Sequence, residues 1–235
     1  MTVPKKIWSR FSPKQRNIKL CILDAPEDRI DQALDLYMGY FLAEEPFSLA
    51  SGIHNNEKAK AEYRSYKYHE SKQLKKLHVM ICCVENENET GLGEIVGVSF
   101  SLLTTTESPL VITLKPETKE LQKLMELWDG MIELFDVLKA LKVNKCYEGM
   151  GIIVHPDYRG LGIAQEFLRA RRLLAKEHGV PITVGWMSST GTQIAAQREG
   201  YETVFEFSFE EFGKKHGVTF ENSPETCKIM RAPAL

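Results

Sequence analysis

A glycine-rich turn between an apolar run and a helical repeat constrains this chain more than any other stretch. The apolar run covers residues 150–154, and the turn passes from Pro156 through Gly160 and Gly162. Beyond the turn, residues recur at helical spacing on one face, namely Ala164, Phe167, Leu168, Arg171, Leu174 and Ala175. This order predicts a strand, a glycine loop and a helix.

Such a loop can bind an anion. The backbone N–H groups at the start of a helix lack intrahelical acceptors, and the helix dipole favours negative charge there. Gly160 and Gly162 would let the backbone approach a phosphate closely. No Lys-Ser or Lys-Thr pair follows, as a P-loop requires, and Gly149-Met150-Gly151 lacks the third glycine of the dinucleotide fingerprint. An ordinary strand-to-helix turn, in which the glycines serve only geometry, is the alternative.

The residues that remain, Arg159-x-x-Gly162-x-Ala164, resemble the coenzyme A signature of the GNAT superfamily of acetyltransferases. The longer stretch 154–164 is similar to the version found in insect arylalkylamine N-acetyltransferases. The resemblance implies that the loop holds the pyrophosphate of acetyl-CoA, while the central strand offers backbone groups to the pantetheine and the acetyl carbonyl. The cofactor-binding residues that it implies are Ile152, Ile153, Val154, Arg159, Gly160, Leu161, Gly162, Ile163 and Ala164.

The composition is that of an ordinary globular protein. Of 235 residues, 43% are hydrophobic and 26% charged, with a formal net charge of −2. A nearly neutral chain has no general attraction for nucleic acid or an anionic membrane, and no apolar stretch is as long as a membrane span. The five cysteines form no C-x-x-C pair and the histidines no metal-ligand spacing, so neither a disulfide framework nor a metal is expected. Since no secretory signal is recognisable, we expect a cytoplasmic protein, acting as a monomer.

Periodicity along the rest of the chain predicts one domain. Residues 1–17 are polar and are expected to form a loosely attached arm, whereas residues 18–235 form the domain. Strands are predicted at 18–23, 78–84, 94–103, 150–154, 181–187, 200–209 and 227–231, and helices at 25–45, 55–77, 121–141, 164–175 and 191–198. The positive charges of the second helix are expected on a solvated face, with steering of an anionic cofactor as the alternative. This alternation predicts a three-layer fold of α+β or α/β class.

The same order is similar to the GNAT arrangement from residue 18 to the C-terminus, which implies a mixed, mostly antiparallel central sheet with flanking helices. Residues 104–145 interrupt it with a polar loop around Pro109 and Pro116, then one helix or two helices broken near Asp129-Gly130. The insect arylalkylamine branch carries a helical insert at this place. We expect the insert to cover a substrate cleft.

Transfer of an acetyl group to an alkylamine needs a base, because the amine is protonated at neutral pH. The resemblance places this role on Glu45, which stands before Pro46 at the end of the first predicted helix. A carboxylate that projects from a helix end into an apolar cleft would have its pKa raised by desolvation, which would improve it as a base. Glu44 stands beside it, and a solvent-exposed charge is the alternative for either glutamate.

The departing thiolate needs a hydrogen-bond donor. Insect relatives carry two hydroxyl residues four positions apart after the strand at 181–187, and these map onto Ser188 and Thr192. The alternative role for these residues is a helix N-cap. The tyrosine that protonates the thiolate in vertebrate-type enzymes is replaced by Ala196, so either a hydroxyl substitutes or the thiolate leaves unassisted. Cys146 could carry the acetyl group, but a buried free thiol is the simpler interpretation.

Together these features predict an acetyl-CoA-dependent N-acetyltransferase for a small primary amine. The expected acceptor is an arylalkylamine such as dopamine, serotonin, tyramine or octopamine, acetylated directly in a ternary complex. Polyamines, agmatine or longer acyl-CoAs are alternatives, because other relatives accept them. A non-catalytic acyl-CoA-binding module is a further alternative, favoured only by Ala196. A protein-lysine or N-terminal acetyltransferase would need an open peptide groove, whereas the insert at 104–145 indicates a covered pocket.

Overall fold

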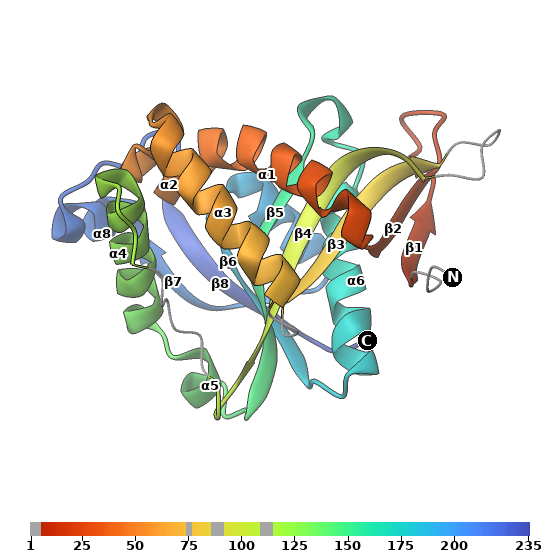
Figure 1. Cartoon of the computed structure of the whole chain (residues 1–235). Helices are drawn as coiled ribbons and strands as arrows, with labels where there is room; N and C mark the ends of the chain where they lie inside the picture. Colours follow the sequence, from red (N-terminus) through yellow and green to blue (C-terminus); the bar gives the residue numbers. More distant parts are fainter. Residues whose placement is uncertain (1–5, 74–76, 86–91, 109–114) are drawn as a thin grey trace.

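A single mixed sheet organises the chain (Figure 1). The computed structural model describes residues 6–73, 77–85, 92–108 and 115–235. Its strands are β1 (Ile7–Phe11), β2 (Leu20–Asp24), β3 (Leu77–Glu85), β4 (Leu92–Thr105), β5 (Lys145–Val154), β6 (Ile182–Met187), β7 (Glu202–Ser208) and β8 (Thr226–Pro233). They lie in the order β1-β2-β3-β4-β5-β6-β8-β7, and every neighbouring pair is antiparallel except β5 and β6, which are parallel. The predicted mixed, mostly antiparallel sheet is confirmed.

Helices cover both faces of this sheet and complete three layers. They are α1 (Ile30–Glu44), α2 (Pro46–Ser51), α3 (Glu57–Gln73), α4 (Lys119–Leu134), α5 (Val137–Ala140), α6 (Ile163–Glu177), α7 (Thr190–Arg198) and α8 (Phe209–His216), with short 3-10 turns at Glu27–Arg29, Ile53–Asn55 and Pro156–Tyr158. In Figure 1, α1 and α3 cross the front of the sheet and α6 lies behind it. One buried core under α1 contains Leu34 and Phe100, and another under α6 contains Phe167 and Leu174. None of the helices in the described ranges has the length and apolar character of a membrane span.

The prediction of a loose N-terminal arm is wrong for residues 7–11. They form edge strand β1, which pairs with β2. The Ser9 hydroxyl donates to the Glu166 carboxylate on α6 at 2.8 Å, and the Arg16 guanidinium donates to the carbonyl oxygen of Asp157 at 3.2 Å. Only Trp8 of this five-residue strand is buried, and its apolar residues do not alternate with polar ones, so the strand signal is weak in the sequence. Residues 1–5 lie outside the described residues.

Two helices were not predicted. Pro46 ends α1 as expected, but it is also the first residue of α2, a position that proline favours because its missing N–H would have no partner there. The extended run expected as far as residue 209 ends at Ser208, where the hydroxyl accepts a hydrogen bond from the Glu211 N–H at 3.4 Å and caps α8.

The insert contains two helices, but they do not break at Asp129-Gly130. Helix α4 continues through Gly130, whose missing side chain leaves room for the His216 ring, since a Cβ there would lie 2.8 Å from Nε2. The break comes at Phe135, after which Asp136 caps α5 by accepting from the Lys139 N–H at 3.1 Å. Residues 109–114 of the preceding loop and the hairpin tip at 86–91 lie outside the described residues.

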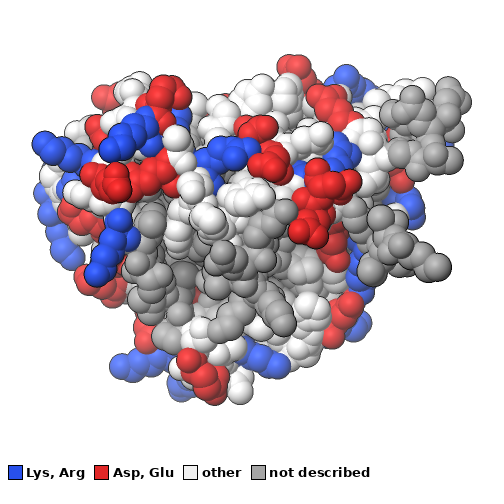
Figure 2. Space-filling model, in the orientation of Figure 1, with Lys and Arg blue, Asp and Glu red and all other residues white. Residues whose placement is uncertain are grey.

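The expected solvated face covers only part of helix α3. A stripe of Ala59, Tyr63 and Lys67 is buried against its neighbours. The Lys67 ammonium lies 5.8 Å from the ring centres of both Tyr63 and Phe100. Over the rest of this face, Figure 2 shows acidic and basic side chains interspersed. Such a mixture gives no extended field of one sign there.

Candidate functional site

The parallel strands β5 and β6 form a fork. They pair only at 147–149 with 183–185, and the last pair joins Gly149 to Gly185. Beyond this apex, β5 continues to Val154 paired with β4 alone, and β6 continues to Met187 paired with β8 alone. The facing edges of the fork therefore carry backbone N–H and C=O groups without a strand partner, which an extended ligand can bind.

A bulge in β5 lies just past the apex. The pairing of β5 with β4 shifts register between Gly149 and Ile152, and Gly151 has φ +120°. The Tyr37 hydroxyl donates to the carbonyl oxygen of Met150 at 3.4 Å, and a Cβ at Gly151 would lie 2.7 Å from that hydroxyl. Both the backbone angle and the close approach require glycine here. Tyr37, which the sequence places on the apolar face of the first helix, thus also contacts the β5 arm of the fork.

The glycine loop joins the β5 arm of the fork to α6. Gly160 and Gly162 are exposed and have φ +76° and +84°. Gly162 is the N-cap residue of α6 and no side chain caps that helix, so the N–H groups of its first turn lack intrahelical acceptors. Ile163 is buried in the core under α6 and fixes the helix start. The predicted segments 152–154 and 159–164 therefore lie consecutively along the fork arm and the loop.

Arg159 connects this loop to the end of α1. Its Nε donates to the carbonyl oxygen of Val154 at 3.1 Å, and its Nη2 pairs with the Glu44 carboxylate at 2.7 Å. Both side chains of the ion pair are partly exposed. The two adjacent glutamates therefore differ, because Glu44 faces outward to the loop.

Glu45 is turned inward and is only 9% exposed. Its Oε2 accepts hydrogen bonds from the N–H of Ser48 at 2.8 Å and from the Ser48 hydroxyl at 3.1 Å, so it caps α2. Burial raises the pKa of the Glu45 carboxyl, while hydrogen bonds from Ser48, Phe47 and Ser188 act in the opposite direction and do not cancel the effect. A capping role and a raised pKa thus coexist at this residue.

Of the two predicted hydroxyls, the structure brings only Ser188 to Glu45. Ser188 follows the last residue of β6, and its hydroxyl lies close enough to the Glu45 carboxylate to favour the charged form. The Thr192 hydroxyl instead donates to the carbonyl oxygen of Ser189 at 2.9 Å and contacts the Ser189 hydroxyl at 2.9 Å, inside the N-terminal turn of α7. The N-cap of α7 is Ser189, whose hydroxyl accepts from the Thr192 N–H at 3.3 Å, so neither predicted hydroxyl is the cap and Thr192 lies in the capped turn.

The contact between Ser188 and Glu45 leads to a testable expectation. Ser188→Ala removes a hydroxyl that favours the charged carboxylate, so the pKa of Glu45 should rise further. The acidic limb of the pH–rate profile should therefore move to higher pH. Thr192→Ala is the matched control and should leave the limb in place. Equal profiles for both variants would contradict the pairing of Ser188 with Glu45.

Comparison with known proteins identifies the fold. No protein-family model matches the sequence, and no curated protein matches it. A structure described as arylalkylamine N-acetyltransferase 7 of the yellow fever mosquito, Aedes aegypti, matches with a TM-score of 0.83 at 22% identity, over 99% of this chain and 97% of that one. This chain has the acetyltransferase fold. Arylalkylamine N-acetyltransferase 2 of Aedes aegypti matches with a TM-score of 0.72 at 15% identity, over 94% and 100% of the two chains. The Drosophila melanogaster polyamine N-acetyltransferase, which forms N-acetylagmatine, matches with 0.67 at 13%, over 91% and 99%.

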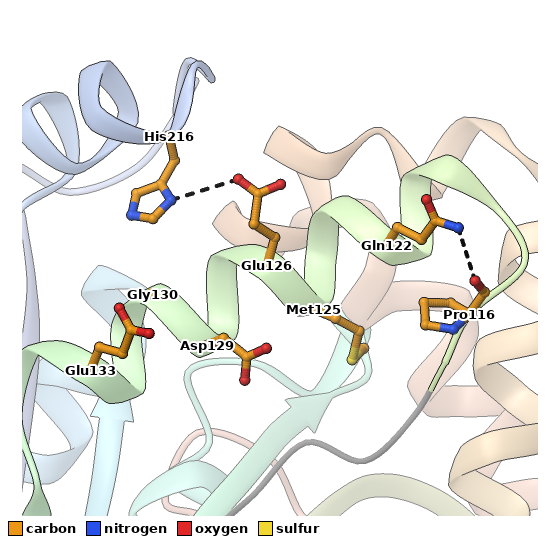
Figure 3. Close-up of a pocket in the computed structure, with 8 residues that line it drawn as sticks. All are labelled: Pro116, Gln122, Met125, Glu126, Asp129, Gly130, Glu133 and His216. Carbon is orange, nitrogen blue, oxygen red and sulfur yellow. Dashed lines mark hydrogen bonds and ion pairs between the residues drawn. The ribbon is translucent and has the colours of Figure 1, made fainter.

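Other features of this acetyltransferase fold lie apart from the fork. Cys146 is buried and its pKa is raised by desolvation, as expected for a structural thiol rather than a nucleophile. A cavity of about 430 Å³ lies along α4, with the ring of His216 at one end (Figure 3). Its lining includes three carboxylates, Glu126, Asp129 and Glu133, but none of the predicted site residues. The cavity and the predicted site are therefore separate.

Proposed function

We propose that this protein is an acetyl-CoA-dependent N-acetyltransferase that acetylates a small primary amine. The observation that carries the proposal is the position of Glu44 and Glu45 between the two arms of the fork. Glu44 forms an ion pair with Arg159 in the loop after β5, and the Glu45 carboxylate lies near the Ser188 hydroxyl directly after β6. A buried carboxylate with a raised pKa therefore lies at the mouth of the fork, the open end where β5 and β6 stop. The loop beside it is suited to a pyrophosphate.

In this proposal some residues along the fork bind the coenzyme and others take part in the reaction. The N–H groups from Gly160 to Ala164 bind the pyrophosphate of acetyl-CoA, and the free edge of Ile152, Ile153 and Val154 binds the pantetheine. Glu45 takes a proton from the ammonium form of the acceptor, directly or through one water. The amine nitrogen then bonds to the acetyl carbon and the carbon–sulfur bond breaks. The sulfur leaves with the electron pair, and the Ser188 hydroxyl is placed to donate to it.

The acceptor that we propose is an arylalkylamine. The support is the fold, which matches that of a mosquito arylalkylamine N-acetyltransferase with a TM-score of 0.83 and that of the Drosophila polyamine enzyme with 0.67. Polyamine or agmatine acetylation is the second candidate, because the fold is also that of the Drosophila enzyme that forms N-acetylagmatine. Acyl chain length and oligomeric state stay predictions.

A two-step experiment tests the function. Acetyl-CoA should raise the midpoint of thermal unfolding, since a ligand at 100 times its dissociation constant stabilises by about 2.7 kcal/mol. Thiol release is then measured with arylalkylamines, agmatine, polyamines and a buffer blank. Fastest release with arylalkylamines would support the proposal, and fastest release with agmatine would favour the second candidate. An absent thermal shift would refute coenzyme binding, and binding without turnover on any amine would indicate a non-catalytic module.

A further inference from the structure

Arg171 is a charged side chain buried inside the fold. It lies on α6, is 1% exposed, and is the largest of the fully buried side chains. Its Nε donates to the Ser101 hydroxyl at 2.9 Å and its Nη2 donates to the Ser99 hydroxyl at 3.2 Å. Within the described ranges no carboxylate hydrogen-bonds to it or forms an ion pair with it. Burial lowers the pKa of this guanidinium, but arginine keeps its proton in proteins.

A buried positive charge without a counterion is unusual. Arginine is rarely buried unless it is paired, because removal of the charge from water carries a large desolvation penalty. Two neutral hydroxyls offset only part of that penalty. A negative charge, or a carbonyl oxygen on which negative charge develops, would therefore be bound favourably by the Arg171 guanidinium.

The guanidinium lies at the apex of the fork. A Cβ on Gly149 would lie 2.9 Å from the Cζ of Arg171, and a Cβ on Gly185 would lie 3.5 Å from its Nη1. These two glycines form the last pair between β5 and β6. Their missing side chains therefore make the space in which the charge sits, directly against the backbone at the point where the strands diverge.

We propose that the Arg171 guanidinium supplies the positive charge that stabilises negative charge on the acetyl oxygen, and then on the coenzyme sulfur, at the apex of the fork. This inference rests on the proposed function, because it needs the acetyl thioester to lie in the fork. As the amine bonds to the acetyl carbon, an electron pair of the carbonyl moves onto its oxygen. When the carbonyl re-forms, the carbon–sulfur bond breaks and the pair goes to sulfur. A fixed charge in a dry interior stabilises both anions without reorganisation.

Other titratable groups near the apex cannot replace Arg171. Tyr201 lies on the same face and interacts with the guanidinium, but its hydroxyl donates to the carbonyl oxygen of Leu168 at 3.1 Å. Glu148 precedes Gly149 on β5, so its side chain leaves the opposite face of the sheet. Glu45, at the mouth of the fork, would carry negative charge and would oppose formation of a thiolate. Among the titratable groups near the apex, Arg171 alone would favour a thiolate, and the Arg171 variants separate its charge from the neutral Ser188 hydroxyl.

The experiment compares binding of coenzyme A with binding of S-methyl coenzyme A, whose sulfur cannot ionise, across a range of pH. The ratio of the two affinities reports only on the thiol, because every other titration is common to both ligands. In the wild-type protein we expect coenzyme A to gain affinity relative to S-methyl coenzyme A as the pH rises. The total gain should be about tenfold for each unit by which binding lowers the pKa of the thiol from its free value near 8.5. Arg171→Gln should abolish the rise and Arg171→Lys should keep part of it.

Arg169→Gln is the matched control, since it removes the same charge from an exposed position on the same helix and should keep the full rise. A flat ratio in the wild-type protein, or a full rise in folded Arg171→Gln, would overturn the role of Arg171. If Arg171→Gln does not fold, Arg171→Lys decides: a rise smaller than that of the wild-type protein supports the role of Arg171, and a full rise overturns it. Failure of both ligands to bind the wild-type protein would instead refute the proposed function.

Discussion

Glu45→Gln is expected to slow acetylation of the amine by about 100- to 10,000-fold, the contribution of a general base. Acetyl-CoA affinity should not change, because the carboxylate accepts hydrogen bonds from Ser48 and makes none with the glycine loop. Initial rates of thiol release give the first quantity, and calorimetric titration with acetyl-CoA gives the second. Loss of both together would place Glu45 in the coenzyme site instead.

Glu45→Gln should also change how the rate depends on pH. The pKa of Glu45 is raised from its ordinary value of 4.5, so kcat/KM of the wild-type protein should fall as pH decreases through that raised value and the base becomes protonated. Glutamine has no such titration, and the acidic limb should disappear from its residual rate. A limb that persists in Glu45→Gln would assign the titration to another group.

The same raised pKa predicts the effect on stability. A carboxyl that holds its proton more tightly in the folded state than in the unfolded state destabilises the protein once the pH exceeds the unfolded value, near 4.5. Glu45→Gln removes this penalty and keeps a carbonyl oxygen that can accept from the Ser48 N–H. The free energy of unfolding of the variant should therefore equal or exceed that of the wild type above pH 4.5, and the difference should shrink below it.

Asp35→Asn is the matched control for Glu45→Gln. It removes one negative charge from the exposed side of α1, where Asp35 pairs with Arg64 at 2.8 Å. An exposed pair contributes at most about 1 kcal/mol, so both rate and stability should stay close to those of the wild type. A comparable loss of rate in both variants would mean that net charge, rather than a base at position 45, controls the reaction.

The sequence predicted those elements that depend only on residues close together in the chain. The strand, loop and helix from β5 to α6 follow from one apolar run, two glycines and a helical repeat. The hairpin of β3 and β4 follows from two β-branched runs. The fork could not be predicted, because it depends on which strand stops pairing with which, and pairing joins residues far apart in the chain.

The sequence places two charged residues at positions typical of a helix's buried face, but it does not show whether their side chains are buried. Arg171 occupies a place in the apolar repeat of α6, and Lys67 continues the stripe of Ala59 and Tyr63 on α3. A long polar side chain at such a position usually extends to the surface. Whether it does depends on the facing element, and here Gly149 and Gly185 leave space on the sheet that the sequence of α6 cannot reveal.

The candidate site was predicted best where a residue's position follows from its own helix. Pro46 fixes the end of α1, and with it the place of Glu45. The pair of Ser188 and Thr192 was harder, because both fit the start of a helix and only the structure shows that Thr192 bonds Ser189 while Ser188 meets Glu45. The two hydroxyls four positions apart thus have different surroundings.

Gly162→Val is expected to weaken binding of acetyl-CoA at least about 100-fold. The left-handed backbone at Gly162 presents the N–H groups of the first turn of α6, and a branched side chain would separate them from a phosphate. Loss of two hydrogen bonds to a charged group, at about 1.5 kcal/mol each, accounts for this factor. Calorimetric titration of acetyl-CoA measures it directly.

Gly200→Val separates this loss from backbone strain. Gly200 has φ +79° against +84° at Gly162, and a Cβ at either position meets no other atom within 4 Å. A non-glycine residue in this conformation costs about 1–2 kcal/mol, so both variants should lose similar stability in thermal unfolding. Only Gly162→Val should lose the coenzyme, because Gly200 follows α7 and not the strand of the fork. Equal acetyl-CoA affinities in the two folded variants would show that the glycine loop serves only to turn the chain.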